Sequence, residues 1–160
     1  MNFEKYTERS SGFIQSAQTL AQRSSHQRLT PEHLLKVLLE DKEGLAANLM
    51  RAAGADPDRA LKAVEAELER QPKVEGSAAG QLYMAPETAR VFETGEKAAQ
   101  KAGDEFVTAE RLLLALALSK GSPAERILSG AGLTAETLNA AIEQDRKSTR
   151  LNSSHIPLSR

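Results

Sequence analysis

The chain has 160 residues, of which 40% are hydrophobic and only 4% aromatic, with no Trp. This length fits one compact domain, and so few aromatic side chains leave Leu, Ala, Ile and Val to build the core, which favours helices. Basic residues number 21 and acidic residues 22, a formal net charge of -1. That balance lacks the basic excess that DNA or RNA binding usually requires, so we expect no nucleic-acid partner.

Cysteines and targeting signals are both missing from the sequence. Without Cys there is no disulfide framework and no thiolate chemistry. The first 30 residues lack the basic and then apolar segments of a secretory signal. The longest apolar run, Leu112–Leu118, has seven residues, against about 20 for a helix that spans a bilayer. We therefore predict a cytoplasmic protein with no membrane partner.

Four helices are predicted in the first part of the chain. Apolar residues recur at helical spacing over 13–21 and again over 34–39, where each set would form one buried face. A third helix is expected at about 45–53 and a fourth from 57 to about 70. Their boundaries are set by Thr30 with Pro31, by Gly54, and by Asp56 with Pro57.

The second part of the chain repeats these signals after a linker at 71–84 that is rich in Gly and small residues. A helix is expected from Pro86 to about Gly103, and three more follow it. Their signals are an N-cap at Thr108, a capping box at Ser122–Glu125, a stop at Gly132 and an N-cap at Thr134. No stretch alternates polar and β-branched residues, so no strands are predicted.

The two parts align with one another without gaps. Residues 13–66 fall on 91–144 at a shift of 78 residues, which indicates two copies of one supersecondary unit. The predicted fold is therefore all-α, an eight-helix bundle made of two four-helix units related by a pseudo-twofold axis. Identical pairs include Ala21/Ala99, Gln22/Gln100, Leu38/Leu116, Lys42/Lys120, Gly54/Gly132 and Glu65/Glu143.

The predicted domain covers 1–146, with one unit at about 3–70 and the other at about 85–146. Residues 147–160 lose helical periodicity and contain no acidic residue, so we expect them to be disordered. Their sequence resembles a translated cloning or sequencing adaptor, and a native flexible linker is the alternative.

Four short segments carry a resemblance to a known family. They are residues 1–7 (MNFEKYT), 30–35 (TPEHLL), 72–76 (PKVEG) and 99–104 (AQKAGD). Together they resemble the N-terminal domain of the ClpB family of bacterial AAA+ disaggregases, over residues 1 to about 144. The doubled unit resembles the Clp repeat that the N-domains of ClpA, ClpB and ClpC share, which implies a compact helical pseudo-dimer.

The resemblance implies a role at the entrance of a hexameric ATP-driven unfoldase that acts in disaggregation after stress such as heat. Its N-domain would bind unfolded or aggregated polypeptide before the AAA+ rings thread it, in cooperation with an Hsp70-type chaperone system. ATP and Mg²⁺ would belong to ATPase domains absent from this chain, because no Gly-Lys-Ser or Gly-Lys-Thr of a P-loop occurs here. We expect this chain to be non-enzymatic and to hold no cofactor or metal.

By position, Thr7, Asp104 and Glu110 resemble the family's polar residues that contact substrate. Each would anchor an extended chain through hydrogen bonds, with no catalysis implied. The alternative is structural: Thr7 would cap the first long helix, and Glu110 would complement a helix dipole.

An apolar surface is the second requirement for binding unfolded chains. Lys36 and Glu40 in the first unit are replaced by Leu114 and Leu118 in the second, four residues apart on one helix face. That face is either buried against the other unit or exposed for binding, and the same alternatives hold for Phe92 and Phe106.

The family's groove is also lined from the helix that spans Pro86 to Gly103. This sequence has Thr94 and Ala98 there, small or polar residues where Leu is often found, which weakens the expected groove.

Two other functions are alternatives to a disaggregase N-domain. The first is the N-domain of a ClpA- or ClpC-type protease unfoldase, which docks adaptor proteins. The second is a small helical hydrolase, which needs a convergent Ser-His or His-carboxylate site, and the sequence shows none.

Overall fold

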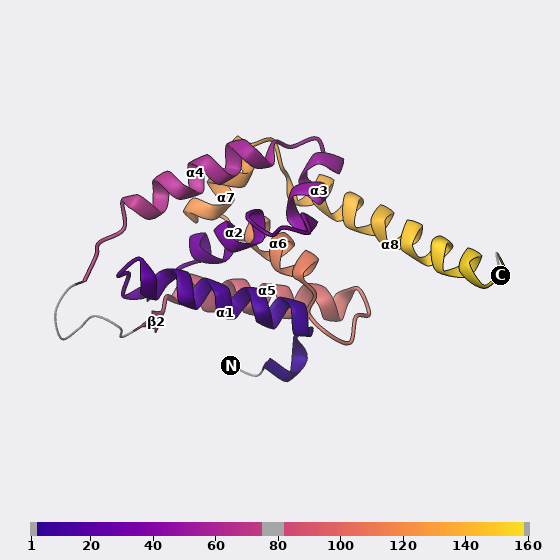
Figure 1. Ribbon diagram of the computed structural model, residues 1–160, viewed down its shortest axis with the longest axis horizontal. Coiled ribbons are helices and arrows are strands. Elements are labelled where there is room, and N and C mark those ends of the chain that lie inside the picture. Colours follow the sequence, from indigo (N-terminus) through magenta and orange to yellow (C-terminus); the bar gives the residue numbers. More distant parts are fainter. Residues whose placement is uncertain (1–2, 75–81, 159–160) are drawn as a thin grey trace.

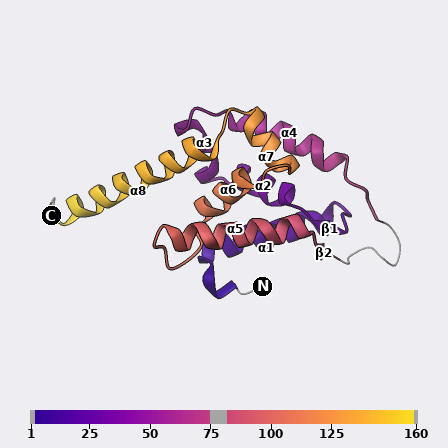
Figure 2. The same ribbon diagram turned by 180° about the vertical axis from the view of Figure 1, so that it is seen from behind.

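Figures 1 and 2 show a structure made almost wholly of helices. The computed structural model describes residues 3–74 and 82–158, with side chains described up to Lys147. Within these residues the predicted all-α, eight-helix fold is confirmed, and a 3-10 turn, Phe3–Lys5, precedes the first α-helix. The helices are α1 (Glu8–Arg23), α2 (Pro31–Leu39), α3 (Leu45–Ala52), α4 (Pro57–Glu69), α5 (Pro86–Lys101), α6 (Ala109–Leu118), α7 (Pro123–Gly130) and α8 (Ala135–Leu158).

The helices of the two halves share their boundaries when the chain is shifted by 78 residues. α1 matches α5 at both ends, and α3 matches α7 at both ends. α2 and α6 match where they begin, as do α4 and α8. The repeat in the sequence therefore corresponds to a repeat of four helices, which we call repeat one (α1 to α4) and repeat two (α5 to α8).

Local residues set where the helices begin. Proline occupies the first turn of α2, α4, α5 and α7, where its missing N–H costs no hydrogen bond. At α2 the backbone N–H of Thr30 donates to Nδ1 of His33 at 3.0 Å. Side-chain oxygens accept first-turn N–H groups at Thr7, Asp56, Thr108 and Ser122.

The prediction that the chain has no strands was wrong in one detail. Residues Arg28–Leu29 form β1 and residues Tyr83–Met84 form β2, and the two pair in parallel. Two residues per strand are too few to leave an alternating pattern in the sequence. An isolated bridge between Tyr6 and Val107 occupies the equivalent place with the two repeats exchanged. Each pairing joins the start of one repeat to the loop after the first helix of the other.

Two buried hydroxyl groups reinforce these pairings. Ser10 Oγ donates to the carbonyl oxygen of Val107 at 2.7 Å, and Thr88 Oγ1 donates to that of Leu29 at 2.7 Å. Ser10 and Thr88 are equivalent positions of the two repeats. The same contact made twice, with the repeats exchanged, indicates an approximate twofold relation between them.

The two repeats share one hydrophobic core. α2 packs on α6, α3 on α8 and α4 on α7, so each contact joins the two repeats. The buried carboxylate of Glu32 on α2 accepts the backbone N–H of Ala124 at the start of α7, at 3.1 Å. Burial raises the pKa of Glu32 above its usual value. The fully buried leucines of the two central helices are Leu34, Leu35, Leu38, Leu112, Leu113 and Leu116.

The C-terminal segment differs from its prediction of disorder. α8 continues to Leu158 and projects beyond the other helices in Figure 1, whereas its equivalent α4 ends at Glu69. Once the packed first half of α8 has formed, each further residue except Pro157 can add one hydrogen bond without a new nucleation cost. Residues 159–160 lie outside the described residues, and the origin of 147–160 as an adaptor stays a prediction.

Half of the predicted linker, residues 75–81, also lies outside the described part.

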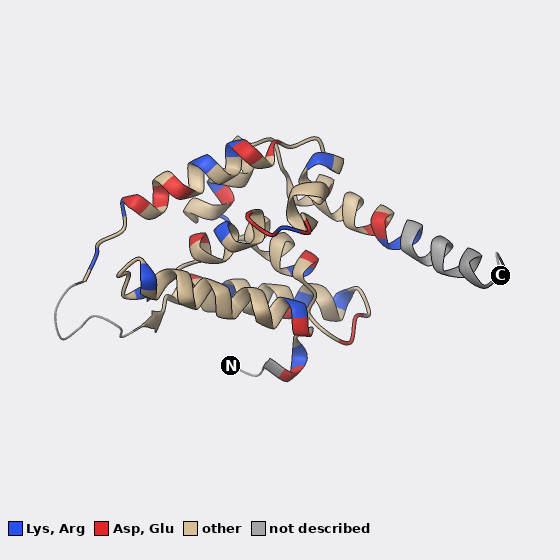
Figure 3. Cartoon of the chain, in the orientation of Figure 1, with Lys and Arg blue, Asp and Glu red and all other residues tan. Residues whose placement is uncertain are grey.

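Acidic and basic residues are interspersed along α4 in Figure 3, as the near-neutral composition suggests. In the described residues no helix is both long and apolar enough to cross a bilayer.

Candidate functional site

A groove of about 590 Å³ lies between α5, α6 and α8 of repeat two. Its apolar lining comes from Leu114 and Leu118 on α6 and from Ala98 on α5. Lys97 on α5 and Glu136 on α8 stand on either side of it. The groove therefore has an aliphatic surface between charged edges.

The two leucines of α6 differ in exposure. Leu114 is 6% exposed, and Leu118, one turn further along, is 42% exposed. Leu114 is thus buried and Leu118 is exposed, and a binding role of either side chain stays a prediction. Covering a half-exposed leucine with an apolar partner is favourable by about 1 kcal/mol, so Leu118 is the residue from which a ligand gains most.

The α5 side of the groove is small and polar, as the sequence indicated. Thr94 and Ala98 line it together with the lysines Lys97 and Lys101. Lysine stems can cover apolar surface while their ammonium groups stay in water. The groove is therefore open on this side and places positive charge along its edge.

Arg111 forms the inner end of the groove and is almost fully buried, with 3% of its side chain exposed. Its Nε donates to Asp104 at 3.2 Å, its Nη1 to Asn139 at 3.3 Å and its Nη2 to Glu143 at 3.4 Å. Arg146 binds both oxygens of Asp104, at 2.8 Å and 3.2 Å. Asp104 raises the pKa of Arg146 by hydrogen bonding. We call these five residues the α8 clamp.

Repeat one lacks an apolar groove at the equivalent place. Lys36, the counterpart of Leu114, lies 3.8 Å from a carboxylate oxygen of Glu40 and 3.7 Å from one of Glu65. The cavity there is smaller, about 370 Å³. His26 and His33 stand at the positions of Asp104 and Arg111, with Nδ1 of the first 2.8 Å from Nε2 of the second.

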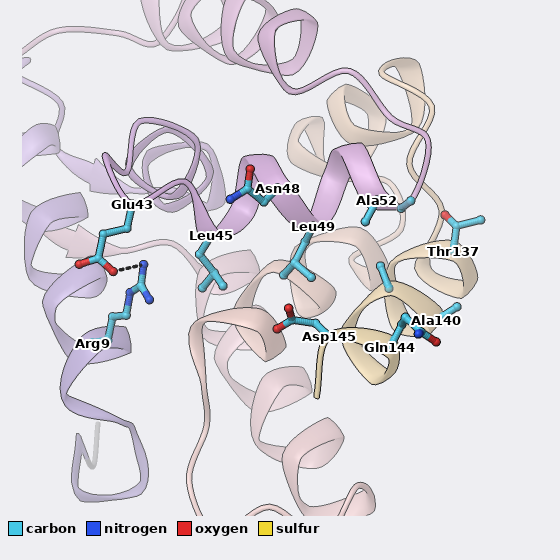
Figure 4. A pocket seen from close by; sticks show the side chains of 12 residues that line it. Arg9, Glu43, Leu45, Asn48, Leu49, Ala52, Thr137, Ala140, Gln144 and Asp145 are labelled. Carbon is cyan, nitrogen blue, oxygen red and sulfur yellow. Dashed lines mark ion pairs between the residues drawn. The ribbon is translucent and has the colours of Figure 1, made fainter. Parts of the chain in front are cut away.

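A second groove, of about 710 Å³, lies on the other side of α8 (Figure 4). Figure 4 shows the ion pair between Arg9 and Glu43 at one end, and their N and O atoms are 3.2 Å apart. Leu49 in its floor is buried. Among the described residues no large hydrophobic side chain that lines this groove is exposed. It is larger than the groove at Leu118 but offers less apolar surface to a ligand.

The three predicted polar contact residues, Thr7, Asp104 and Glu110, lie in or next to the loop between α5 and α6. The backbone N–H of Thr7 donates to the carbonyl oxygen of Val107 at 3.1 Å, and its hydroxyl caps α1. Glu110 is half-buried in the first turn of α6. Asp104 is 9% exposed at its side chain, and both of its oxygens are bound by arginines. The predicted structural role of Thr7 as a cap is confirmed.

The two phenylalanines have opposite environments. Phe92 is buried in the core, in edge-to-face contact with Tyr6 at 6.1 Å between ring centroids. It does not line the groove, because the inward face of α5 carries it into the shared core, so it cannot contact a polypeptide bound there. Phe106 is 45% exposed but lies in the α5–α6 loop, outside the groove.

Sequence reasoning missed the α8 side of the site. No sequence signal marks Asn139, Glu143 or Arg146 as site residues, and Arg111 stands directly before the apolar run that begins at Leu112. A charged residue at a core position of a repeat was an available signal, because a buried arginine requires partners. Its partners Asn139 and Glu143 lie on α8, two helices further along the chain, and no local pattern joins them to it.

Among the residues with described side chains, no group of three or more acidic or histidine side chains could hold a metal ion. Burial and the adjacent Glu96 raise the pKa of Tyr6, and burial lowers the pKa of His33. Both residues lie in the core, away from the groove.

Comparison with known sequences gives one family over nearly the whole chain. Residues 5–153 match the model of the Clp repeat (R) N-terminal domain. A chaperone protein ClpB of Rhodopseudomonas palustris is 59% identical over 147 residues, which cover 92% of this chain and 17% of that protein. One from Meiothermus ruber is 36% identical over 155 residues, 97% of this chain and 17% of that protein. The chain thus spans about a sixth of the length of these relatives.

Solved structures share the fold at lower sequence identity. The Hsp104 N-terminal domain of Candida albicans superimposes with a TM-score of 0.76 at 21% identity, covering 88% of this chain and 91% of that one. The N-domain of ClpV from Vibrio cholerae gives 0.70 at 18% identity, with 89% and 85% covered. With the doubled four-helix unit and the family match, these findings show that the chain belongs to the Clp repeat N-terminal domain family.

Proposed function

We propose that this chain is the substrate-recognition N-domain of a ClpB-like disaggregase and binds unfolded or aggregated polypeptide in the groove between α5, α6 and α8. One observation carries the proposal: Leu118 is a large exposed apolar side chain that lines a cavity. Unfolded chains differ from folded ones by their exposed apolar side chains, which such a surface can cover.

Leu114 forms the floor of the groove, while Glu110 and Thr7 do not line it and would contact only a polypeptide that extends beyond it towards the α5–α6 loop. Charged edges from Lys97 and Glu136 favour backbone and side-chain hydrogen bonds of either polarity. A broad, mixed surface of this kind suits recognition without a fixed sequence.

The bound polypeptide would pass to AAA+ modules of a longer cytoplasmic protein, which assemble as a hexamer and use ATP and Mg²⁺. Support comes from the ClpB relatives, of which this chain spans 17%. Cooperation with an Hsp70-type chaperone belongs to the same proposal.

Replacing Leu118 by Ser tests the groove. Because it removes about 1 kcal/mol of apolar burial, we expect the dissociation constant for an unfolded probe to rise about fivefold. The measurement is fluorescence anisotropy with labelled lactalbumin that has been reduced and carboxymethylated.

Phe106→Ser is the matched control, since Phe106 is similarly exposed but lines a different cavity, of about 430 Å³, beside the α5–α6 loop. It should bind like the parent chain. Equal loss in both variants would reveal non-specific apolar adhesion, and no loss in Leu118→Ser would place the binding surface elsewhere.

A further inference from the structure

Asp104 stands beside the groove without lining it. Its two carboxylate oxygens accept from Arg111 and from both terminal nitrogens of Arg146, at distances from 2.8 to 3.2 Å. The side chain is 9% exposed. A carboxylate held in this way has little surface and few free lone pairs for a passing polypeptide.

The clamp joins the two sides of the groove. Asp104 follows the end of α5, Arg111 lies on α6, and Asn139, Glu143 and Arg146 lie on α8. α5 and α8 each pack on α6, so the link from Asp104 to Arg146 ties the end of α5 to α8. Arg111, Asn139 and Glu143 also line the groove, so any shift of α8 changes its width.

Repeat one shows what the fold does without such a clamp. The pair of His26 and His33 stands where Asp104 and Arg111 do, but leucines, Leu61 and Leu68, replace Asn139 and Arg146. α4 therefore offers this pair neither an amide like that of Asn139 nor a guanidinium like that of Arg146, and the ion pairs of Lys36 line the smaller cavity at this place. The α8 clamp occurs in the repeat that carries the groove.

We infer that Asp104 is a positioning residue that fixes the width of the groove by holding α8 through Arg111 and Arg146, without touching the bound polypeptide. This inference rests on the function proposed above. It differs from direct polar anchoring in the effect expected of replacing Arg146, a residue that does not line the groove.

Two substitutions separate the two roles. If Asp104 positions α8, Arg146→Met and Asp104→Asn each weaken binding of carboxymethylated lactalbumin, by about fivefold, and the double variant is no weaker than either. If Asp104 anchors polypeptide directly, Arg146→Met frees the carboxylate and binding becomes tighter or stays the same. Asp104→Asn leaves the buried Arg111 without its carboxylate and is expected to lower the stability of the chain. Arg146 is only partly buried, so Arg146→Met is expected to keep the fold, and its effect on binding decides between the two roles.

Groove width has its own measurement. The chain has no Cys, so spin labels can be attached at Lys97→Cys and Glu136→Cys, which are exposed on opposite sides of the groove. Electron-electron double resonance should show a broader and displaced distance distribution in Arg146→Met. Arg70→Met is the control, because it removes one arginine from a surface ion pair with Glu67 at 3.0 Å, outside the groove.

The two proposals fail separately. If the parent chain does not bind the unfolded probe, the proposed function is overturned, and the distance distribution alone decides the role of Asp104. An unchanged distribution in Arg146→Met, or tighter binding by it, overturns the positioning role.

Discussion

His33 shows how one buried side chain can fix the protonation state of its neighbour. Its Nδ1 accepts the backbone N–H of Thr30, so the ring hydrogen lies on Nε2, which donates to Nδ1 of His26. Both acceptor nitrogens are occupied by donors, so a proton added to either ring breaks a hydrogen bond. Burial, and next the positive charge that His26 can acquire, lower the pKa of His33 to about 4. Burial, and next the charge of Lys73, lower that of His26.

Stability is therefore expected to fall in mild acid. Above pH 6.5 both the folded and the unfolded chain hold neutral histidines, and the contribution of the pair is complete. As the pH falls from about 6.5 towards 4, His26 and His33 bind protons in the unfolded chain but stay neutral in the folded chain. The free energy of unfolding should decrease with a limiting slope of about 1.4 kcal/mol per pH unit for each such histidine.

Thermal unfolding between pH 7 and pH 4.5 measures this slope, and NMR titration of the ring signals of His33 assigns it. The double variant His26→Asn, His33→Gln is the control, because it keeps polar groups that do not titrate in this range. A ring of His33 that titrates near pH 6.5 in the folded chain would contradict the assignment.

At the scale of elements, the turn after the first helix of each repeat adopts one conformation with two different residues. Ser25 has φ of 60° after α1, and its equivalent Gly103 has φ of 79° after α5. Positive φ costs an L-residue about 1 kcal/mol, whereas glycine adopts it freely. Repeat one therefore carries strain that repeat two avoids.

Ser25→Gly should stabilise the chain by about 0.5–1 kcal/mol, since relief of the positive φ exceeds the entropy that glycine adds to the unfolded state. The reverse change, Gly103→Ser, should destabilise it by a similar amount, because a Cβ there meets no neighbouring atom within 4 Å and only the backbone resists. Urea unfolding of both variants measures the difference. If both substitutions changed the free energy of unfolding in the same direction, side-chain contacts and not the positive φ would determine the stability of these turns.

Helix positions could be predicted from the sequence because their signals are local. Pro86, Thr108 and Ser122 mark their helices in the structure where the sequence marked them. β1 and β2 could not be predicted, because their pairing joins residues far apart and leaves no periodicity. The same reason hid Arg146, whose partner Asp104 is 42 residues away. Leu118 was found because comparison of the two repeats exposed a change of polarity.

At the scale of the whole molecule, the pseudo-twofold axis runs where equivalent glycines meet. A Cβ built on Gly132 would lie 3.6 Å from the carbonyl oxygen of Gly54, and the N–H of Asp56 donates to the carbonyl oxygen of Ala131 at 2.9 Å. With α2 on α6, α3 on α8 and α4 on α7, each repeat completes the core of the other. Neither repeat has a closed core of its own.

Fragments 1–74 and 82–160 are therefore expected to have little stable helix when separate, since short chains with an incomplete core cannot offset their conformational entropy. Mixed in equal amounts, they should recover most of the helical signal of the parent chain. Far-UV circular dichroism measures both. A cooperative thermal transition of fragment 1–74 alone would show that repeat one is an independent folding unit.

The ion pairs of Lys36 have a consequence for valency. They place charged groups in repeat one where repeat two has the leucines of the groove, so among the described residues the two repeats together offer one apolar groove at Leu118 and no apolar counterpart of it. Two identical sites on one rigid body would hold a long chain with avidity, and release would require both to dissociate together. With a single apolar groove, a bound segment would leave in one step, which fits the proposed role of passing polypeptide to AAA+ modules.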